Sequence, residues 1–109
     1  MKMAAAAMSI IDWEKIEPTR HPGEVGFAQW RTCMFGDIRV RIVEYSPGYL
    51  ADHWCSKGHV ILCMDGPLEI ELADGTHRRL ESGQTYHVGD GEPAHRSHAP
   101  EGAYLFIVD

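Results

Sequence analysis

Short runs in which apolar and polar residues alternate, separated by turn residues, are the feature that most limits what this chain can fold into. Residues 38–45 are an example, because isoleucine and valine at 38, 40 and 42 alternate with arginine at 39 and 41. An alternation with period two places one kind of side chain on each face of a β-strand. We interpret seven runs as strands, at residues 26–35, 38–45, 49–64, 68–72, 76–80, 85–88 and 103–108.

Glycine and proline mark the ends of these runs. Asp74-Gly75 is a strong hairpin signal, and Ser46-Pro47-Gly48 and Asp65-Gly66-Pro67 favour tight turns. The eleven glycines and six prolines are scattered along the chain, and no run has a convincing helical pattern. Short strands joined by regular turns are typical of an all-β sandwich or barrel.

The chain divides into an N-terminal arm, residues 1–24, and a single domain, residues 25–109. Pro18, Pro22 and Gly23 argue against a continuous element in the arm, which we expect to be irregular. A length of 109 residues suits one domain with its own core. The run 103–108 is apolar on both faces, which is typical of a central or interface strand and leads us to expect a homodimer.

Charge, hydropathy and cysteine content narrow the range of partners. The formal net charge is −6 with acidic and basic residues interleaved, so the sequence lacks the basic patch expected of a nucleic-acid binder. No apolar stretch approaches the length of about 20 residues that spans a bilayer, and the N-terminal region turns polar before it reaches secretory length. The three cysteines, Cys33, Cys55 and Cys63, cannot all pair with one another. We therefore expect a cytoplasmic protein with free thiols that binds neither nucleic acid nor membrane.

The candidate site begins in residues 52–59. If this run stays extended, His53, Cys55 and His59 share one face of a strand. His95, after two further strand-like segments, is the fourth candidate ligand. Imidazole and thiolate groups favour Zn²⁺, Ni²⁺, Fe²⁺ or Cu over Mg²⁺ or Ca²⁺. The alternative is that these are core or turn residues, with Cys55 a small buried hydrophobe or a thiol beside the metal rather than a ligand.

Two groups of residues in this region carry a family resemblance. They are Pro47-Gly48, His53-Trp54-Cys55, His59 and Gly66, followed by Gly89 to Pro93 and His95. These resemble the first and second motifs of the cupin family, with Cys55 at the position of a histidine and His59 at the position of an acid. Residues 45–55 and 105–109 also resemble small single-domain cupins that carry an Asp-His-Cys-Trp type of motif. The resemblance covers about residues 24–109 and implies a cupin-type β-barrel, or jelly roll, with a metal site.

Two functions stay open at this point. In the first, three protein ligands leave positions open on the metal, and the protein is an oxygenase- or isomerase-like enzyme for a small organic substrate. Its cavity would be lined by Ile61, Leu68, Ile70 and Met34. In the second, all four ligands close a tetrahedral site in a noncatalytic binding or sensing module. No residue stands out as a general base, so the number of protein ligands has to decide between the two.

Overall fold

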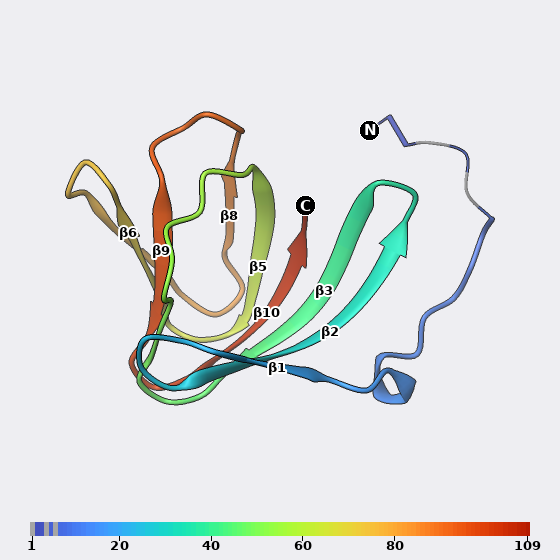
Figure 1. Ribbon diagram of the computed structural model, residues 1–109, viewed down its shortest axis with the longest axis horizontal. Coiled ribbons are helices and arrows are strands. Elements are labelled where there is room, and N and C mark those ends of the chain that lie inside the picture. Colours follow the sequence, from blue (N-terminus) through green and yellow to red (C-terminus); the bar gives the residue numbers. More distant parts are fainter. Residues whose placement is uncertain (1, 4, 6) are drawn as a thin grey trace.

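The computed structural model describes residues 2, 3, 5 and 7–109, and these form two β-sheets that face each other (Figure 1). The elements are a 3₁₀ turn η1 (Trp13–Lys15) and the strands β1 (Thr19–Pro22), β2 (Phe27–Phe35), β3 (Ile38–Tyr45), β4 (Tyr49–Leu50), β5 (His59–Asp65), β6 (Leu68–Leu72), β7 (His77–Leu80), β8 (Thr85–Val88), β9 (His95–Ala99) and β10 (Ala103–Val108). One sheet has six strands in the order β1-β2-β3-β10-β5-β8, and the other has four in the order β4-β9-β6-β7. This arrangement confirms the prediction of an all-β fold.

The strands with the clearest alternation have the predicted bounds. Residues 38–45, 68–72, 85–88 and 103–108 form β3, β6, β8 and β10. The run 103–108 is apolar on both faces because β10 is central, pairing with β3 on one side and β5 on the other. Its side chains point alternately into the space between the two sheets and to the outer side of the six-stranded sheet.

The prediction of one strand over residues 49–64 is wrong. β4 ends at Leu50 and β5 begins at His59, and the connector 51–58 between them is irregular. The connector follows β9 rather than β5: the amide of Ala51 donates to the carbonyl of Ser97, and Cys55 forms an isolated bridge with His95. At its end, the amide of Gly58 donates to the carboxylate of Asp90. These partners lie far away in the sequence, so the local alternation did not reveal them.

Part of the N-terminal arm belongs to the sheet. β1 pairs antiparallel with β2, in a register that runs from Thr19 opposite Trp30 to Pro22 opposite Phe27. The pairing is reinforced by side chains, because the ring of His21 stacks on Trp30 with ring centroids 3.8 Å apart. The arm is therefore irregular only outside β1 and η1, and β1 forms one edge of the six-stranded sheet.

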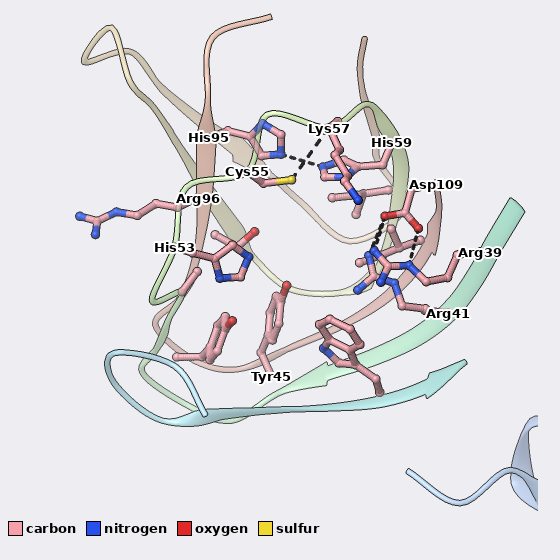
Figure 2. Close-up of a pocket in the computed structure, with 16 residues that line it drawn as sticks. Arg39, Arg41, Tyr45, His53, Cys55, Lys57, His59, His95, Arg96 and Asp109 are labelled. Carbon is pink, nitrogen blue, oxygen red and sulfur yellow. Dashed lines mark hydrogen bonds and ion pairs between the residues drawn. The ribbon is translucent and has the colours of Figure 1, made fainter. Parts of the chain in front are cut away.

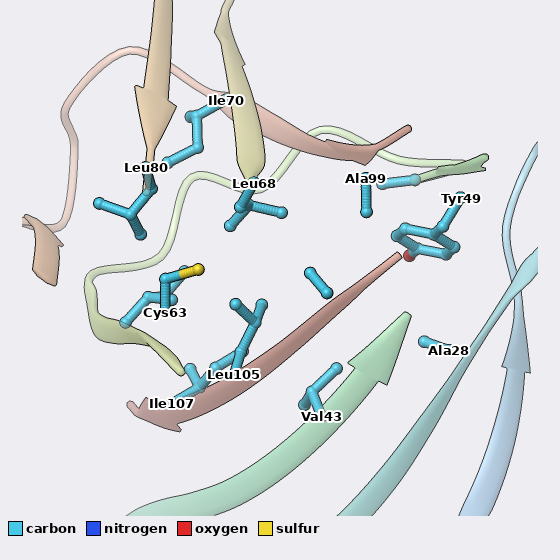
Figure 3. Packing of buried hydrophobic residues seen from close by; sticks show 13 residues of the cluster. Ala28, Val43, Tyr49, Cys63, Leu68, Ile70, Leu80, Ala99, Leu105 and Ile107 are labelled. Atoms are coloured by element: carbon cyan, nitrogen blue, oxygen red, sulfur yellow. The ribbon is translucent and has the colours of Figure 1, made fainter. Parts of the chain in front are cut away.

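The hydrophobic core fills the space between the two sheets (Figure 3). Val43 and Leu105 from the six-stranded sheet and Leu68 from the four-stranded sheet are fully buried there. Burial of each such side chain contributes about 1.5–3 kcal/mol. Ile70 is buried in the same cluster. The prediction that Leu68, Ile70 and Met34 line the ligand cavity is wrong, because none of them lines the cavity described below. Ile61 does line it, although it also belongs to the core cluster.

The outward side of β5 and β10 remains apolar and accessible. Val60, Met64 and Tyr104 are 45%, 37% and 38% exposed, and Leu62 and Phe106 lie between them as a register pair. We call these five residues the outer face. Among the residues that the structure describes, no helix has the length and apolar character needed to cross a membrane.

Candidate metal centre

Three of the four predicted ligands come together at the wall of a cavity (Figure 2). The ligand atoms of Cys55, His59 and His95 all lie within 4.8 Å of one another. The Nε2 atoms of His59 and His95 are 2.7 Å apart, and the two rings meet edge to face. The cavity has a volume of about 110 Å³, below the roughly 300–1,000 Å³ of drug-sized ligand pockets, so it suits only a compact molecule.

Each of the three residues is held by a different part of the fold. His59 begins β5 in the six-stranded sheet, and His95 begins β9 in the four-stranded sheet. Cys55 lies in the connector, where its amide donates to the carbonyl of His95 at 2.8 Å and its carbonyl accepts from the amide of His95 at 2.9 Å. The main chain therefore places the thiol beside His95. The predicted convergence is observed, but through this bridge rather than through a shared strand face.

Burial keeps both imidazoles neutral. His95 is only 3% exposed, and burial lowers its pKa. Burial also lowers the pKa of His59 to about 4, and the charge that His95 would carry is the second cause. Near pH 7 both rings are then uncharged, and each has a nitrogen lone pair that a metal can use.

The donor atoms suit a borderline transition metal. They are two imidazole nitrogens and one sulfur, with no carboxylate in the group, whereas Mg²⁺ and Ca²⁺ prefer oxygen ligands. A tetrahedral zinc ion, with Zn–N bonds of about 2.0–2.1 Å, holds two nitrogens roughly 3.3 Å apart. The rings of His59 and His95, now 2.7 Å apart at Nε2, would have to separate only slightly to meet that requirement. The residues therefore fit such an ion.

The remaining ring nitrogens lack the support common at metal centres. The Nδ1 atoms of His59 and His95 are buried, and neither makes a well-formed hydrogen bond among the described residues, although the backbone of Pro93 lies close enough to His95 to raise its pKa against the effect of burial. A metal-binding histidine usually donates this N–H to a carboxylate or a carbonyl, which fixes the ring and strengthens binding. A metal held here should therefore exchange more readily than at a fully supported site.

His53, the fourth predicted ligand, lies outside this group of three. Its Nδ1 is 2.8 Å from a carboxylate oxygen of Asp52, and both side chains are more than half exposed. The hydrogen bond to His53 is the main cause that lowers the pKa of Asp52. His53 still lines the same cavity, so its role as a ligand stays a prediction that would require its ring to turn.

A charged cluster in the cavity wall was not anticipated from the sequence. Arg39 donates from Nε and Nη2 to the two carboxylate oxygens of Asp109, at 3.0 and 2.7 Å, and Arg41 donates from Nη2 to Asp109 at 3.1 Å. Burial would raise the pKa of Asp109, but the hydrogen bond to Arg39 and the charges of Arg41 and Arg39 outweigh it, and the pKa is lowered. In the structure both arginines share strand parity with Val43, which lies in the core.

No family model matches the sequence, and no curated protein matches it. Solved structures match most of the chain. An RmlC-like cupin from Shewanella frigidimarina NCIMB 400 has 15% sequence identity and a TM-score of 0.75, over 94% of this chain and 90% of its own. Ectoine synthase from P. lautus has 19% identity and a TM-score of 0.72, over 93% of this chain and 76% of its own.

A third structure, a sugar phosphate isomerase from a cupin superfamily of Silicibacter pomeroyi, has 15% identity and a TM-score of 0.69, over 92% of this chain and 74% of its own. At such identities the likeness establishes the fold and nothing finer. The chain has the cupin fold, as the two motifs predicted, and its Cys/His/His group is compatible with metal binding.

Proposed function

We propose that this protein is a metal-dependent cupin that binds a small organic molecule in the cavity beside Cys55, His59 and His95. The observation that carries the proposal is the convergence of these three ligand atoms within 4.8 Å at the cavity wall. The metal is a divalent transition ion such as Zn, Ni, Fe or Cu, because the donors are imidazole and thiol groups.

The arrangement supports an enzyme over a purely structural metal site. Three residues form the group, and His53 lies outside it, which leaves a coordination position open. A bound metal of this kind supplies Lewis-acid or redox chemistry at such a position. The chain's own part is to hold the ion with two neutral rings and a thiol, and to limit the substrate to a size that the cavity accepts. Oxygenase- and isomerase-like reactions are the ones to assay, and one protein of similar fold is described as a sugar phosphate isomerase.

The alternative is a noncatalytic module whose metal is closed off by a fourth ligand. One observation favours it: His53 lines the same cavity as the three grouped residues. If its ring turned away from Asp52 to reach the metal, the site would have the four ligands of a structural zinc centre.

We also propose that the chain forms a homodimer in the cytoplasm. The outer face on β5 and β10 is apolar and accessible, and a second copy of the chain could cover it in a symmetric pair. A reducing compartment would keep the thiol of Cys55, which is free in the structure, available to a metal. Size-exclusion chromatography with light scattering tests the dimer, and replacement of Val60 by glutamate should yield monomers.

Metal analysis of protein purified without an affinity tag tests the main proposal. The wild type should carry about one transition-metal ion per chain, and His95→Ala should carry almost none. His87→Gln, on an exposed position of β8, is the matched control and should keep its metal. Full metal content in both His95→Ala and His59→Ala would overturn the ligand assignment.

A second variant decides between the open and the closed site. His53→Gln should leave the metal affinity within about twofold if the centre is open, because its ring is not part of the group. A loss of affinity of tenfold or more would favour the closed, noncatalytic module.

A further inference from the structure

The cavity wall that carries the metal group also carries two arginines, a buried Arg41 and a partly exposed Arg39. Arg39 and Arg41 share one carboxylate, that of Asp109, and all three side chains line the cavity. Both carboxylate oxygens of Asp109 accept hydrogen bonds from Arg39, and one of them also accepts from Arg41. The two guanidinium groups therefore share a single side-chain carboxylate.

Arg41 is the arginine of this cluster that is more deeply buried and makes fewer side-chain hydrogen bonds. Its side chain is only 8% exposed, and its Nε is buried without a hydrogen-bond partner. The guanidinium lies 4.3 Å from the centre of the Trp30 ring, a contact that stabilises the cation but satisfies no N–H donor. A buried guanidinium has five N–H donors, and leaving charged donors unpaired is costly. Because Arg41 lines the cavity and makes one side-chain hydrogen bond, from Nη2 to Asp109, an acceptor that enters the cavity could pair with its remaining donors.

The other basic groups of the cavity do not fill this role. Arg96 is turned away from the cavity (Figure 2), where its Nε donates to Glu71 at 3.1 Å and its Nη1 lies 3.6 Å from Glu24. Lys57 also lines the cavity, and it adds positive charge without an acidic partner among the hydrogen bonds and ion pairs of the described residues. The arginine side chains that remain for a ligand inside the cavity are therefore Arg41 and Arg39.

We propose that the ligand of this cavity is a small organic carboxylate, bound with its carboxylate on Arg41 and a second oxygen directed at the Cys55, His59 and His95 group. The metal end of this arrangement rests on the function proposed above, whereas the Arg41 end does not. A carboxylate matches the planar fork of a guanidinium and accepts from two of its N–H groups at once. The small volume of the cavity restricts the ligand to a compact acid.

Isothermal titration with malonate, a compact dicarboxylate, tests the proposal on metal-loaded and metal-free protein. Malonate should bind the metal-loaded wild type, and malonamide, its neutral counterpart of similar shape, should bind at least tenfold more weakly. Arg41→Gln should weaken malonate binding tenfold or more, whereas the matched control Arg96→Gln should change it less than twofold. Equal binding of malonate and malonamide, or full affinity in Arg41→Gln, would overturn the proposal.

Two further arms cover the remaining outcomes. If Arg41→Gln does not fold, Arg41→Lys keeps the charge but loses the two-pronged contact, and it should still bind malonate several-fold more weakly than the wild type. Inorganic phosphate, titrated in the same way, should bind more weakly than malonate. Equal binding of phosphate would replace a carboxylate site by a general anion site and contradict the assignment.

Metal content, measured on the same samples, separates this inference from the proposed function. Arg41→Gln should retain the metal of the wild type, since Arg41 is not in the ligand group. If the wild type holds metal but does not bind malonate, the inference fails and the metal-dependent function stands. If the wild type holds no metal but binds malonate through Arg41, the proposed function fails and the anion site stands.

Discussion

The metal-free protein should lose stability in mild acid because of His59. In the folded protein, burial and the neighbouring His95 lower the pKa of His59 from 6.5 to about 4. In the unfolded chain the ring regains its ordinary value. Between these two values the unfolded state binds more protons than the folded state, so the free energy of unfolding falls as the pH falls. The effect is absent above about pH 6.5 and is complete below about pH 4.

The size of the effect follows from the two pKa values. Each pKa unit corresponds to about 1.36 kcal/mol, so the difference between 6.5 and about 4 sets an upper limit of about 3 kcal/mol. His59 is only partly buried, and solvent screening reduces the expected loss to about 1–2 kcal/mol. His95 shares the direction of the shift and adds to the slope in the wild type.

Urea denaturation in the presence of a chelator, at several pH values from 7.5 to 4.5, measures this loss. In His59→Gln the free energy of unfolding should depend less steeply on pH than in the wild type. The substitution removes one of the two buried imidazoles, and it also removes the charge repulsion that this ring would exert on His95. His87→Gln, at the exposed position on β8, should follow the wild type. Parallel curves for the wild type and His59→Gln would show that the ring is not kept neutral by the fold, and the reasoning would be refuted.

Three other changes test the site and its surroundings. Cys55→Ser should lower the metal affinity by more than about 100-fold, because loss of a residue that only hydrogen-bonds a metal ligand already costs roughly 10–100-fold. It should also abolish the thiolate-to-metal absorption band. An unchanged spectrum would show that the thiol does not coordinate. Asp109→Asn leaves Arg39 and Arg41 without their carboxylate and should cost about 2–4 kcal/mol in urea denaturation, with a change below 0.5 kcal/mol contradicting the buried ion pair. Gly66→Ala would bring its Cβ within 2.6 Å of the Cys63 sulfur and should cost about 1–3 kcal/mol, part of which Cys63→Ala should restore.

Much of the fold could be predicted because alternation is a local property. In β3 and β10 the pattern and the flanking turns determine the strand bounds, and the structure confirms them. The pattern could not show which face of β3 points into the core, because both faces turn out to be buried. Val40 and Ile42 are buried on one face, and Arg41 and Val43 are buried on the other. The charged cluster was missed for that reason.

The candidate site was predicted in part, and for a partly mistaken reason. Residue types and motif spacing singled out Cys55, His59 and His95, which the fold does bring together. The shared strand face that was expected to do so does not exist, since the connector 51–58 leaves the sheet to bridge with β9. His53, chosen by the same parity argument, ends beside Asp52 instead. Long-range backbone pairing decided these positions, and a single sequence carries little trace of it.

The placement of His59 on one sheet and His95 on the other has a mechanical consequence. An ion held by both rings would link the two sheets where β5 and β9 begin, in addition to any chemistry it performs. Its removal should loosen the ends of β5 and β9 and leave the far end, around Leu68 and Leu105, closed. Local opening near the site and global unfolding would then respond differently to a chelator. Amide hydrogen exchange should accelerate first at the starts of β5 and β9.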